Sequence, residues 1–188
     1  MANKNTQGFG LIPGDRLGNT PAISGQSKYF IDAGDATVIF NGGAVKSAAG
    51  YIVEGQGSAA PVIGVLNGVF FNAATTLKPT FANFYSGSIT PANSEDITAF
   101  INDDPFQNYI VATDAAAAQA VFLETFDMNA SAGSSTTGKS SSTLDIGTTS
   151  ADGKQYRLLR SAEDPDNSDA TAAFASVVVV ANLLELQS

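Results

Sequence analysis

Short apolar segments, each closed by a turn residue, run through this chain from Lys28 almost to its end. They recur about every 8 to 15 residues, with Gly, Pro, Asn, Asp and Ser between them, which is typical of antiparallel β-strands. No alternation of strands with long helical patterns is visible, so a parallel α/β sheet is not expected. The pattern predicts an all-β fold, an antiparallel β-sandwich or barrel with at most one or two short helices.

Individual strands can be placed from this texture. We expect them at residues 28–31, 36–40, 45–47, 51–53, 62–72, 79–85, 97–102, 108–113, 121–128, 142–146, 155–159 and 173–186. In the longest early segment, VIGVLNGVFFN, Gly64 and Gly68 indicate a β-bulge or the close approach of a neighbouring backbone. A short helix is expected at the Ala-rich residues 115–119, because the Asp114 side chain could accept the free N–H groups of its first turn.

The first part of the chain differs in composition from the rest. Residues 1–27 are rich in Gly, Asn, Pro and Ser and show no apolar period, which predicts an extended N-terminal arm. Its few apolar side chains could anchor the arm on a partner surface or on another subunit, and they are Phe9, Leu11, Ile12 and Leu17. Residues 28–188 are expected to form a single β-rich domain, a size that suits one hydrophobic core.

The composition restricts the chemistry of the chain. It contains neither His nor Cys, which removes the commonest general base, the commonest transition-metal ligand and all disulfides. The Ser side chains have no activating base in a recognisable motif. We therefore expect no enzyme activity, no cofactor and no metal ion.

The charge of the chain bears on its partners. The formal net charge is −9 and the nine basic residues are scattered, so direct binding to nucleic acid is not expected. No apolar run approaches the roughly 18 residues of a membrane span, so no membrane is expected either, and the chain is predicted to be made in the cytoplasm. Charged residues make up only 14% of the sequence, against about 25% in ordinary soluble domains. So few charges favour a surface that partner proteins cover.

One segment matches a nucleotide-binding motif. The sequence GSSTTGKS, from Gly133 to Ser140, fits the pattern GxxxxGK[ST] of a phosphate-binding loop. That loop requires a helix directly after it, yet residues 141–153 contain three Thr, a Gly within the first seven residues and no helical apolar period. The late apolar strand ends near Asn182 and Glu185, where an NTPase would need an Asp for Mg²⁺. We interpret the segment as a flexible surface loop.

A second segment raises the question of calcium. Residues 163–169, EDPDNSD, place oxygen ligands at alternate positions Asp164, Asp166 and Ser168, which resembles half of a calcium-binding loop. The glycine and the distal Glu of an EF-hand loop are missing. Asp, Asn, Pro and Ser are also the residues that turns select, so a solvated turn is the favoured interpretation and calcium the alternative.

The order of several motifs resembles a known family. These motifs are the arm MANKN with its later GF, the strand YFI at 29–31, IFNGGAV at 39–45, VIGVLNGVFF at 62–71, ITAFINDDPF at 97–106, YIVAT at 109–113, SSTLD at 141–145 and YRLLRSAEDPDN at 156–167. In this order they are similar to the small β-rich structural proteins that tailed bacteriophages encode beside the major capsid protein. The chain departs from the family pattern at Gly42-Gly43, where Gly-Asp is typical, and in the arm, where an Arg is typical near the GF.

The resemblance implies a function. Proteins of this kind decorate or cement the head shell, so we expect a structural virion protein that bridges major capsid protein subunits on the capsid surface. Self-association is also implied, with a trimer favoured and a dimer second, because a shell lattice offers symmetric positions. Two alternatives remain: another virion module such as a tail, fibre-base or host-adhesion protein, and a small nucleotide hydrolase that uses Lys139.

Overall fold

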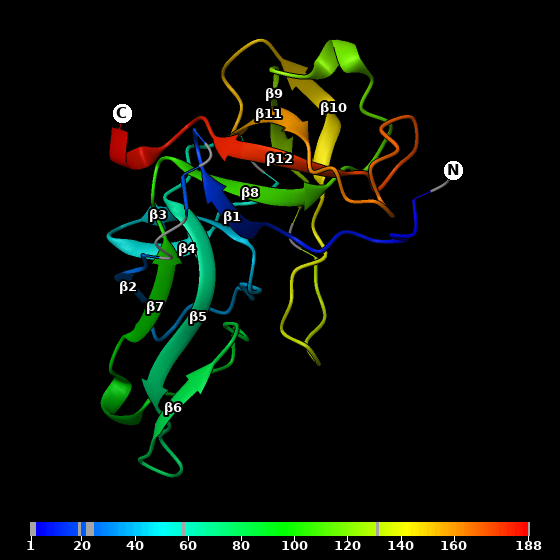
Figure 1. Ribbon diagram of the computed structural model, residues 1–188. Coiled ribbons are helices and arrows are strands. Elements are labelled where there is room, and N and C mark those ends of the chain that lie inside the picture. The colour runs from blue at the N-terminus through cyan, green and yellow to red at the C-terminus, as the bar shows by residue number, and fades with distance from the viewer. Residues whose placement is uncertain (1–2, 19, 22–24, 58, 131, 188) are drawn as a thin grey trace.

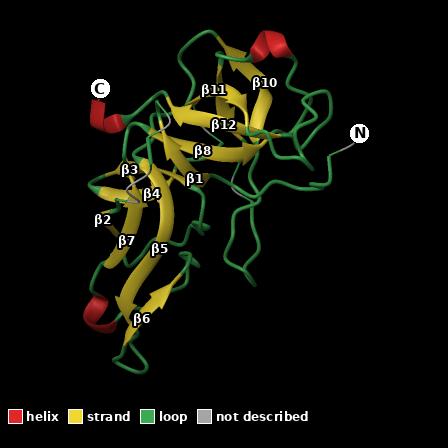
Figure 2. Cartoon of the chain, in the orientation of Figure 1, coloured by secondary structure: helices red, strands yellow, loops and turns green. Residues whose placement is uncertain are grey.

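The computed structural model describes residues 3–18, 20–21, 25–57, 59–130 and 132–187. The fold is all-β, with two antiparallel sheets packed together as in a β-sandwich, so the fold class expected from the sequence is confirmed. Figure 1 shows an elongated molecule in which one sheet, here called the upper sheet, lies above the other, the lower sheet. Short 3₁₀ turns are the helical elements of the described residues, as Figure 2 shows, and they are η1 (Ala92–Ser94), η2 (Gln119–Val121) and η3 (Glu185–Gln187).

The upper sheet is built from the arm and the second half of the chain. Its strands follow the order β1-β8-β12-β11-β9-β10, and every pair is antiparallel. The bounds are β1 Ile12–Arg16, β8 Gln107–Ala112, β9 Thr125–Met128, β10 Leu144–Ser150, β11 Tyr156–Ser161 and β12 Ser176–Ala181.

The lower sheet is built from the first half of the chain. Its strands follow the order β2-β7-β5-β3-β4, and β6 pairs with the far part of β5. The bounds are β2 Ser27–Ile31, β3 Ala44–Ala48, β4 Tyr51–Glu54, β5 Gly64–Asn72, β6 Pro79–Ala82 and β7 Ile97–Asn102. The sheet is curled, and as a result the strands at its two ends, β2 and β4, lie close together.

Alternation of buried and exposed side chains explains why segments of the lower sheet form strands. In β7, Ile97, Ala99 and Ile101 are buried, whereas Thr98 and Phe100 between them are partly exposed on the other face. This period of two is what a strand with one buried face requires.

Both glycines of β5 have the roles expected from the sequence. The register against β7 shifts between Leu66 and Gly68, which is a bulge. A Cβ on Gly64 would lie 2.1 Å from the carbonyl oxygen of Asn102, and one on Gly68 would lie 2.5 Å from the ring of Phe81. Only glycine lets these neighbours approach so closely.

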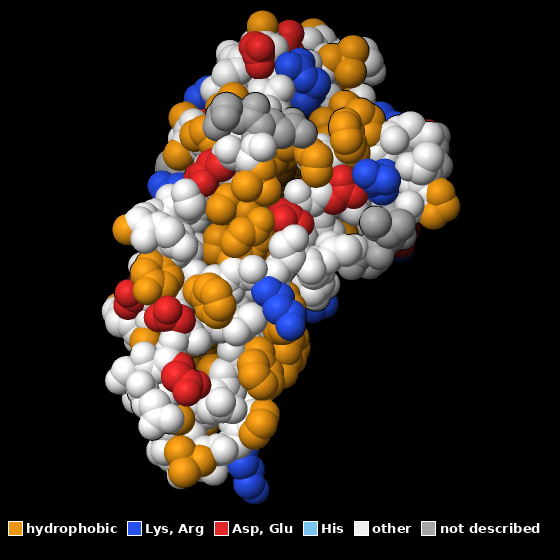
Figure 3. All heavy atoms as spheres, turned by 90° about the vertical axis from the view of Figure 1, so that its left-hand side faces the viewer, with side chains coloured by type: hydrophobic (Ala, Val, Ile, Leu, Met, Phe, Trp, Pro, Cys, Tyr) orange, Lys and Arg blue, Asp and Glu red, His pale blue; other side chains and the backbone are white. Residues whose placement is uncertain are grey.

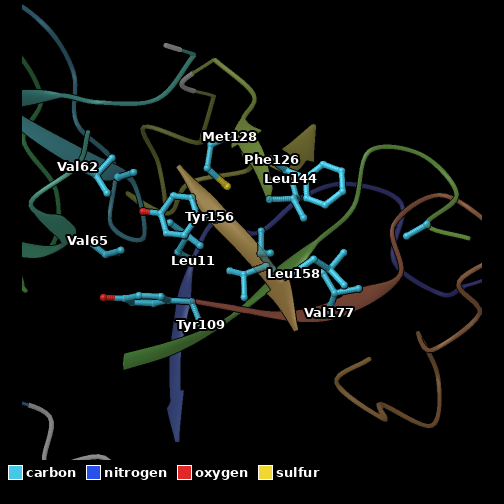
Figure 4. Close-up of a cluster of buried hydrophobic side chains, with 14 of the residues drawn as sticks. Leu11, Val62, Val65, Tyr109, Phe126, Met128, Leu144, Tyr156, Leu158 and Val177 are labelled. Atoms are coloured by element: carbon cyan, nitrogen blue, oxygen red, sulfur yellow. The ribbon is translucent and has the colours of Figure 1, made fainter. Parts of the chain in front are cut away.

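Each sheet has its own hydrophobic cluster, and the clusters meet at one end of the lower sheet. The lower cluster fills the curl of that sheet and contains Ile31, Ile39, Val45, Ile52, Ile63, Leu66, Val69, Tyr85, Ile97, Ala99 and Ile101. The upper cluster contains Leu11, Tyr109, Val111, Ala117, Phe126, Met128, Leu144, Tyr156, Leu158, Val177, Val179 and Leu184, together with Ala44, Val62 and Val65 from the lower half of the chain. In Figure 4, the hydroxyl groups of Tyr109 and Tyr156 point to the side on which Val62 and Val65 lie.

Three local expectations differ from the structure. Residues 36–40 form a single bridge, Ile39 with Tyr85, instead of a strand. The helix expected at 115–119 is wrong: Asp114 accepts its hydrogen bond from the Ile146 N–H at 2.9 Å, across the sheet, and therefore does not cap a helix. Strand β1 was not expected, because its Pro and Gly interrupt any apolar period.

Candidate interaction surfaces

The four apolar residues of the arm divide into two kinds. Leu11 is only 1% exposed and belongs to the upper cluster of its own chain, and Phe9 is half-buried. Ile12 and Leu17 are each 48% exposed, on or just beyond β1, the edge strand that pairs with β8. The structure therefore leaves Ile12 and Leu17 available for a partner and places Leu11 in the fold.

The start of the arm binds the late part of the same chain. The Asn3 side-chain amide donates hydrogen bonds to the carbonyls of Asp169 (3.0 Å) and Ala173 (2.9 Å). The Asn5 N–H donates to the side-chain oxygen of Asn167 at 2.7 Å. The arm is thus extended but lies along the upper sheet of its own domain, as the blue segment in Figure 1 shows.

The acidic turn at 163–169 holds this segment. Asp164 accepts hydrogen bonds from the Asp166 N–H (3.0 Å) and from the Asn167 side chain (2.8 Å), and this bonding lowers the pKa of its carboxyl group. Lys4 pairs with Asp166 at 2.8 Å. The carboxylates of Asp164 and Asp166 therefore bind the chain's own backbone and side chains, as in a solvated Asx turn. Among the described residues, no three His, Cys, Asp or Glu side chains come together in a way that could hold a metal ion.

The segment Gly133 to Ser140 is a hairpin closed by a bridge between these two residues. It extends from the upper sheet towards the lower one (Figure 1), where the Gly138 carbonyl accepts the Asn41 N–H at 2.9 Å. The Thr137 carbonyl accepts the side-chain amide of Asn83 at 2.7 Å. The chain then continues to strand β10 without a helix, so the geometry of a phosphate-binding loop is not present. The loop connects the two halves of the molecule.

A group of phenylalanines forms an uncovered surface on the lower sheet, here called the Phe platform: Phe30, Phe70, Phe81 and Phe100. Phe30 and Phe70 both lie opposite Thr98 of β7, and Phe70 also lies opposite Phe81. Residues directly opposite one another share a face of a sheet, and Phe100 shares the face of Thr98 because it lies two residues further along β7.

The rings of the platform are in contact with solvent. Phe30 is 53% exposed, Phe70 38% and Phe81 61%. Phe81 and Phe100 lie with their ring centroids 6.1 Å apart at an angle of 45°. Figure 3 shows hydrophobic side chains at the surface of this lower half from one side.

The platform continues a face that is covered elsewhere. Asn102, two residues beyond Phe100, is only 4% exposed because the upper sheet packs over it. The Tyr109 hydroxyl donates to the Asn102 carbonyl at 3.2 Å. One face of β7 is therefore buried at one end and presents aromatic rings to solvent at the other.

Sequence reasoning did not identify the platform as a site. The twelve Phe residues stand mostly at strand positions, where they are expected in a core or an interface alike. Several of the expected strands contain Phe, but the pairing register of the strands decides which of these Phe side chains share a face.

Comparison with known protein families, with curated proteins and with solved structures found no match to this chain. Within the part of the chain that the structure describes, no helix has the length and apolar character needed to cross a bilayer.

Proposed function

We propose that the protein is a non-enzymatic structural component of a phage virion that binds the head shell and bridges major capsid protein subunits. The observation that carries the proposal is the Phe platform, a group of four Phe rings on the lower sheet, three of which are at least 38% exposed. Large exposed apolar patches in soluble proteins mark interaction sites. The resemblance in motif order supports the same function.

The free energies of burial and association favour attachment at several points. Burying one Phe side chain contributes about 1.5–3 kcal/mol, and association itself costs roughly 4–15 kcal/mol. Four rings on one protomer are therefore a modest contact. A symmetric oligomer, with a trimer favoured over a dimer, would present several platforms and gain avidity from the repeated lattice. The exposed arm residues Ile12 and Leu17 add a second point of contact.

Binding to heads that lack the protein tests the proposal. Wild-type protein added to such heads should sediment with them and raise the temperature at which they rupture. The double variant Phe30→Ser, Phe81→Ser should lose both effects while keeping its fold, because these side chains are exposed. Leu186→Ser, which removes an exposed Leu from η3, is the matched control and should bind like wild type. Heads whose rupture temperature does not depend on the protein would contradict the function.

Electron microscopy of the assembled particle separates the head from the tail. Density at symmetry positions of the head lattice is expected. Density confined to the tail or fibre base would overturn the proposal in favour of another virion module. Turnover of ATP or GTP that Lys139→Ala abolishes would overturn the non-enzymatic part.

A further inference from the structure

A groove of about 590 Å³ lies on the upper half of the molecule, away from the Phe platform. Its walls come from the η2 region, from β11 and from the loop before β12. Most of the lining is apolar: Ala117, Ala118, Phe122, Leu123, Leu159 and Ala170, with Gln119, Arg160, Ser161 and Thr171 as the polar members.

A β-bulge places two different side chains in this groove. In the pairing of β11 with β12, Leu158 lies opposite Val179, and Arg160 lies opposite Val178, so Leu159 is an extra residue. Such a bulge changes the direction of side chains, and bulges are common beside functional sites. Leu159 and Arg160 are consecutive in the chain and nevertheless both line the groove.

Hydrogen bonds within the chain hold the walls of the groove in place before any partner binds. The Leu123 N–H donates to the Leu158 carbonyl at 2.8 Å, and the Arg157 guanidinium donates to the Leu123 carbonyl. Leu123 is held at φ 72° with its side chain 62% exposed at the rim. On the opposite wall, the Ala117 N–H donates to the Ala170 carbonyl at 2.9 Å. A preformed site loses less entropy when a partner binds.

Charge indicates what the groove would accept. Of the three arginines, Arg16 pairs with Asp104 at 2.7 Å and Arg157 with Asp152 at 3.6 Å. The Arg160 side chain makes no hydrogen bond or ion pair with any residue that the structure describes, and it is the charged member of the lining. A planar guanidinium beside apolar walls suits a carboxylate that is attached to an apolar group.

We infer that this groove binds an extended segment of a partner protein that presents an apolar side chain next to an Asp or Glu. The apolar side chain packs against Leu123, Phe122 and Leu159, and the carboxylate accepts hydrogen bonds from Arg160. A single cation is not a track for a nucleic-acid backbone, which needs clustered basic residues. This site is independent of the Phe platform and of the proposed attachment to a head shell.

A displayed library of random heptapeptides provides the test. The library is selected on the full-length protein after depletion on the double variant Leu123→Ser, Arg160→Gln. The selected peptides should share an apolar residue adjacent to Asp or Glu. By fluorescence anisotropy, the best of them should bind about tenfold more weakly to Arg160→Gln, and changing its own carboxylate to the amide should cause a similar loss. Lys28→Gln, which removes an exposed cation from the lower sheet, is the control and should bind like wild type.

Other results overturn the inference. These are the absence of any groove-dependent consensus, a consensus without an acidic residue, or equal binding by wild type and Arg160→Gln. Self-association of the protein that Arg160→Gln abolishes would assign the groove to a second copy instead. Thermal unfolding of each variant shows that it is folded, so a loss of binding can be assigned to the groove.

Discussion

The hydroxyl of Tyr109, on β8 of the upper sheet, donates a hydrogen bond to the backbone carbonyl of Asn102, on β7 of the lower sheet, at 3.2 Å. Both residues are buried, and the ring of Tyr109 also packs edge-on against Tyr156, with centroids 6.4 Å apart. Burial raises the pKa of both phenols, so both are neutral at physiological pH. The two sheets are therefore joined by a polar contact inside an apolar cluster.

The two tyrosines should respond differently to loss of the hydroxyl. Tyr109→Phe removes the hydrogen bond to the buried Asn102 carbonyl and should lower the free energy of unfolding by about 1–2 kcal/mol. The Tyr156 hydroxyl is buried and has no hydrogen-bond partner among the described residues, so Tyr156→Phe should be neutral or stabilising. Urea unfolding measures both, and equal losses in the two variants would contradict the distinction.

Neighbouring arm residues should separate folding from binding. Leu11→Ala removes a side chain from the upper cluster and should cost about 2–5 kcal/mol of stability. Ile12→Ala and Leu17→Ala remove exposed side chains and should change stability by less than about 1 kcal/mol. The same two variants should weaken attachment to the head shell. If they destabilise the protein as much as Leu11→Ala, the arm is wholly a part of the fold.

The hairpin at 133–140 offers a test at two adjacent residues. Gly138 has φ 69°, and a Cβ there would lie 2.4 Å from the Asn83 side chain and 2.5 Å from the ring of Phe84. Gly138→Ala should therefore lower the free energy of unfolding by about 1–2 kcal/mol or more. Lys139→Ala should leave stability nearly unchanged, and neither variant should affect any nucleotide binding. A loss of ATP affinity in Lys139→Ala would support a phosphate-binding loop instead.

The turn that holds the arm should weaken in acid. The Asn167 side chain and the Asp166 N–H lower the pKa of Asp164, so the folded state binds its proton less readily than the unfolded state does. The stabilisation is present above the ordinary Asp pKa of about 3.9 and is lost as the pH falls through the lower folded value. The stability difference between wild type and Asp164→Asn should thus shrink below about pH 4. The protection factor of the Asn5 N–H against hydrogen exchange, which allows for the slower intrinsic exchange in acid, should fall over the same range; a stability difference that does not change with pH would contradict the assignment.

The alternation of apolar and other residues predicted strands well where one face of the strand is buried. The expected strand at 97–102 coincides with β7 because Ile97, Ala99 and Ile101 repeat at every second position. The glycines of β5 were also informative, since a bulge and a close approach both require the absence of a side chain. Local sequence failed at β1, whose Pro13 and Gly14 carry no strand signal and which exists because β8 offers an edge to pair with.

Tertiary contacts decide the features that sequence could not predict. The Ala-rich stretch after Asp114 has helix propensity, but the Ala117 N–H bonds to a distant carbonyl at residue 170 and its side chain is completely buried. The Phe platform depends on the register of four strands, and the groove depends on a bulge that no turn residue marks. Of the arm residues, Leu11 was expected to contact a partner, but the structure buries it in the upper cluster of its own chain.

The hydrogen bond from Asn5 to Asn167 spans 162 residues of chain. Contacts of such high sequence separation form late and slow folding, because loop closure must precede them. Asn3 and Asn5 can therefore take their places only after residues 167–173, which supply their hydrogen-bond partners, have been made. Completion of the upper sheet therefore depends on residues from both ends of the described chain.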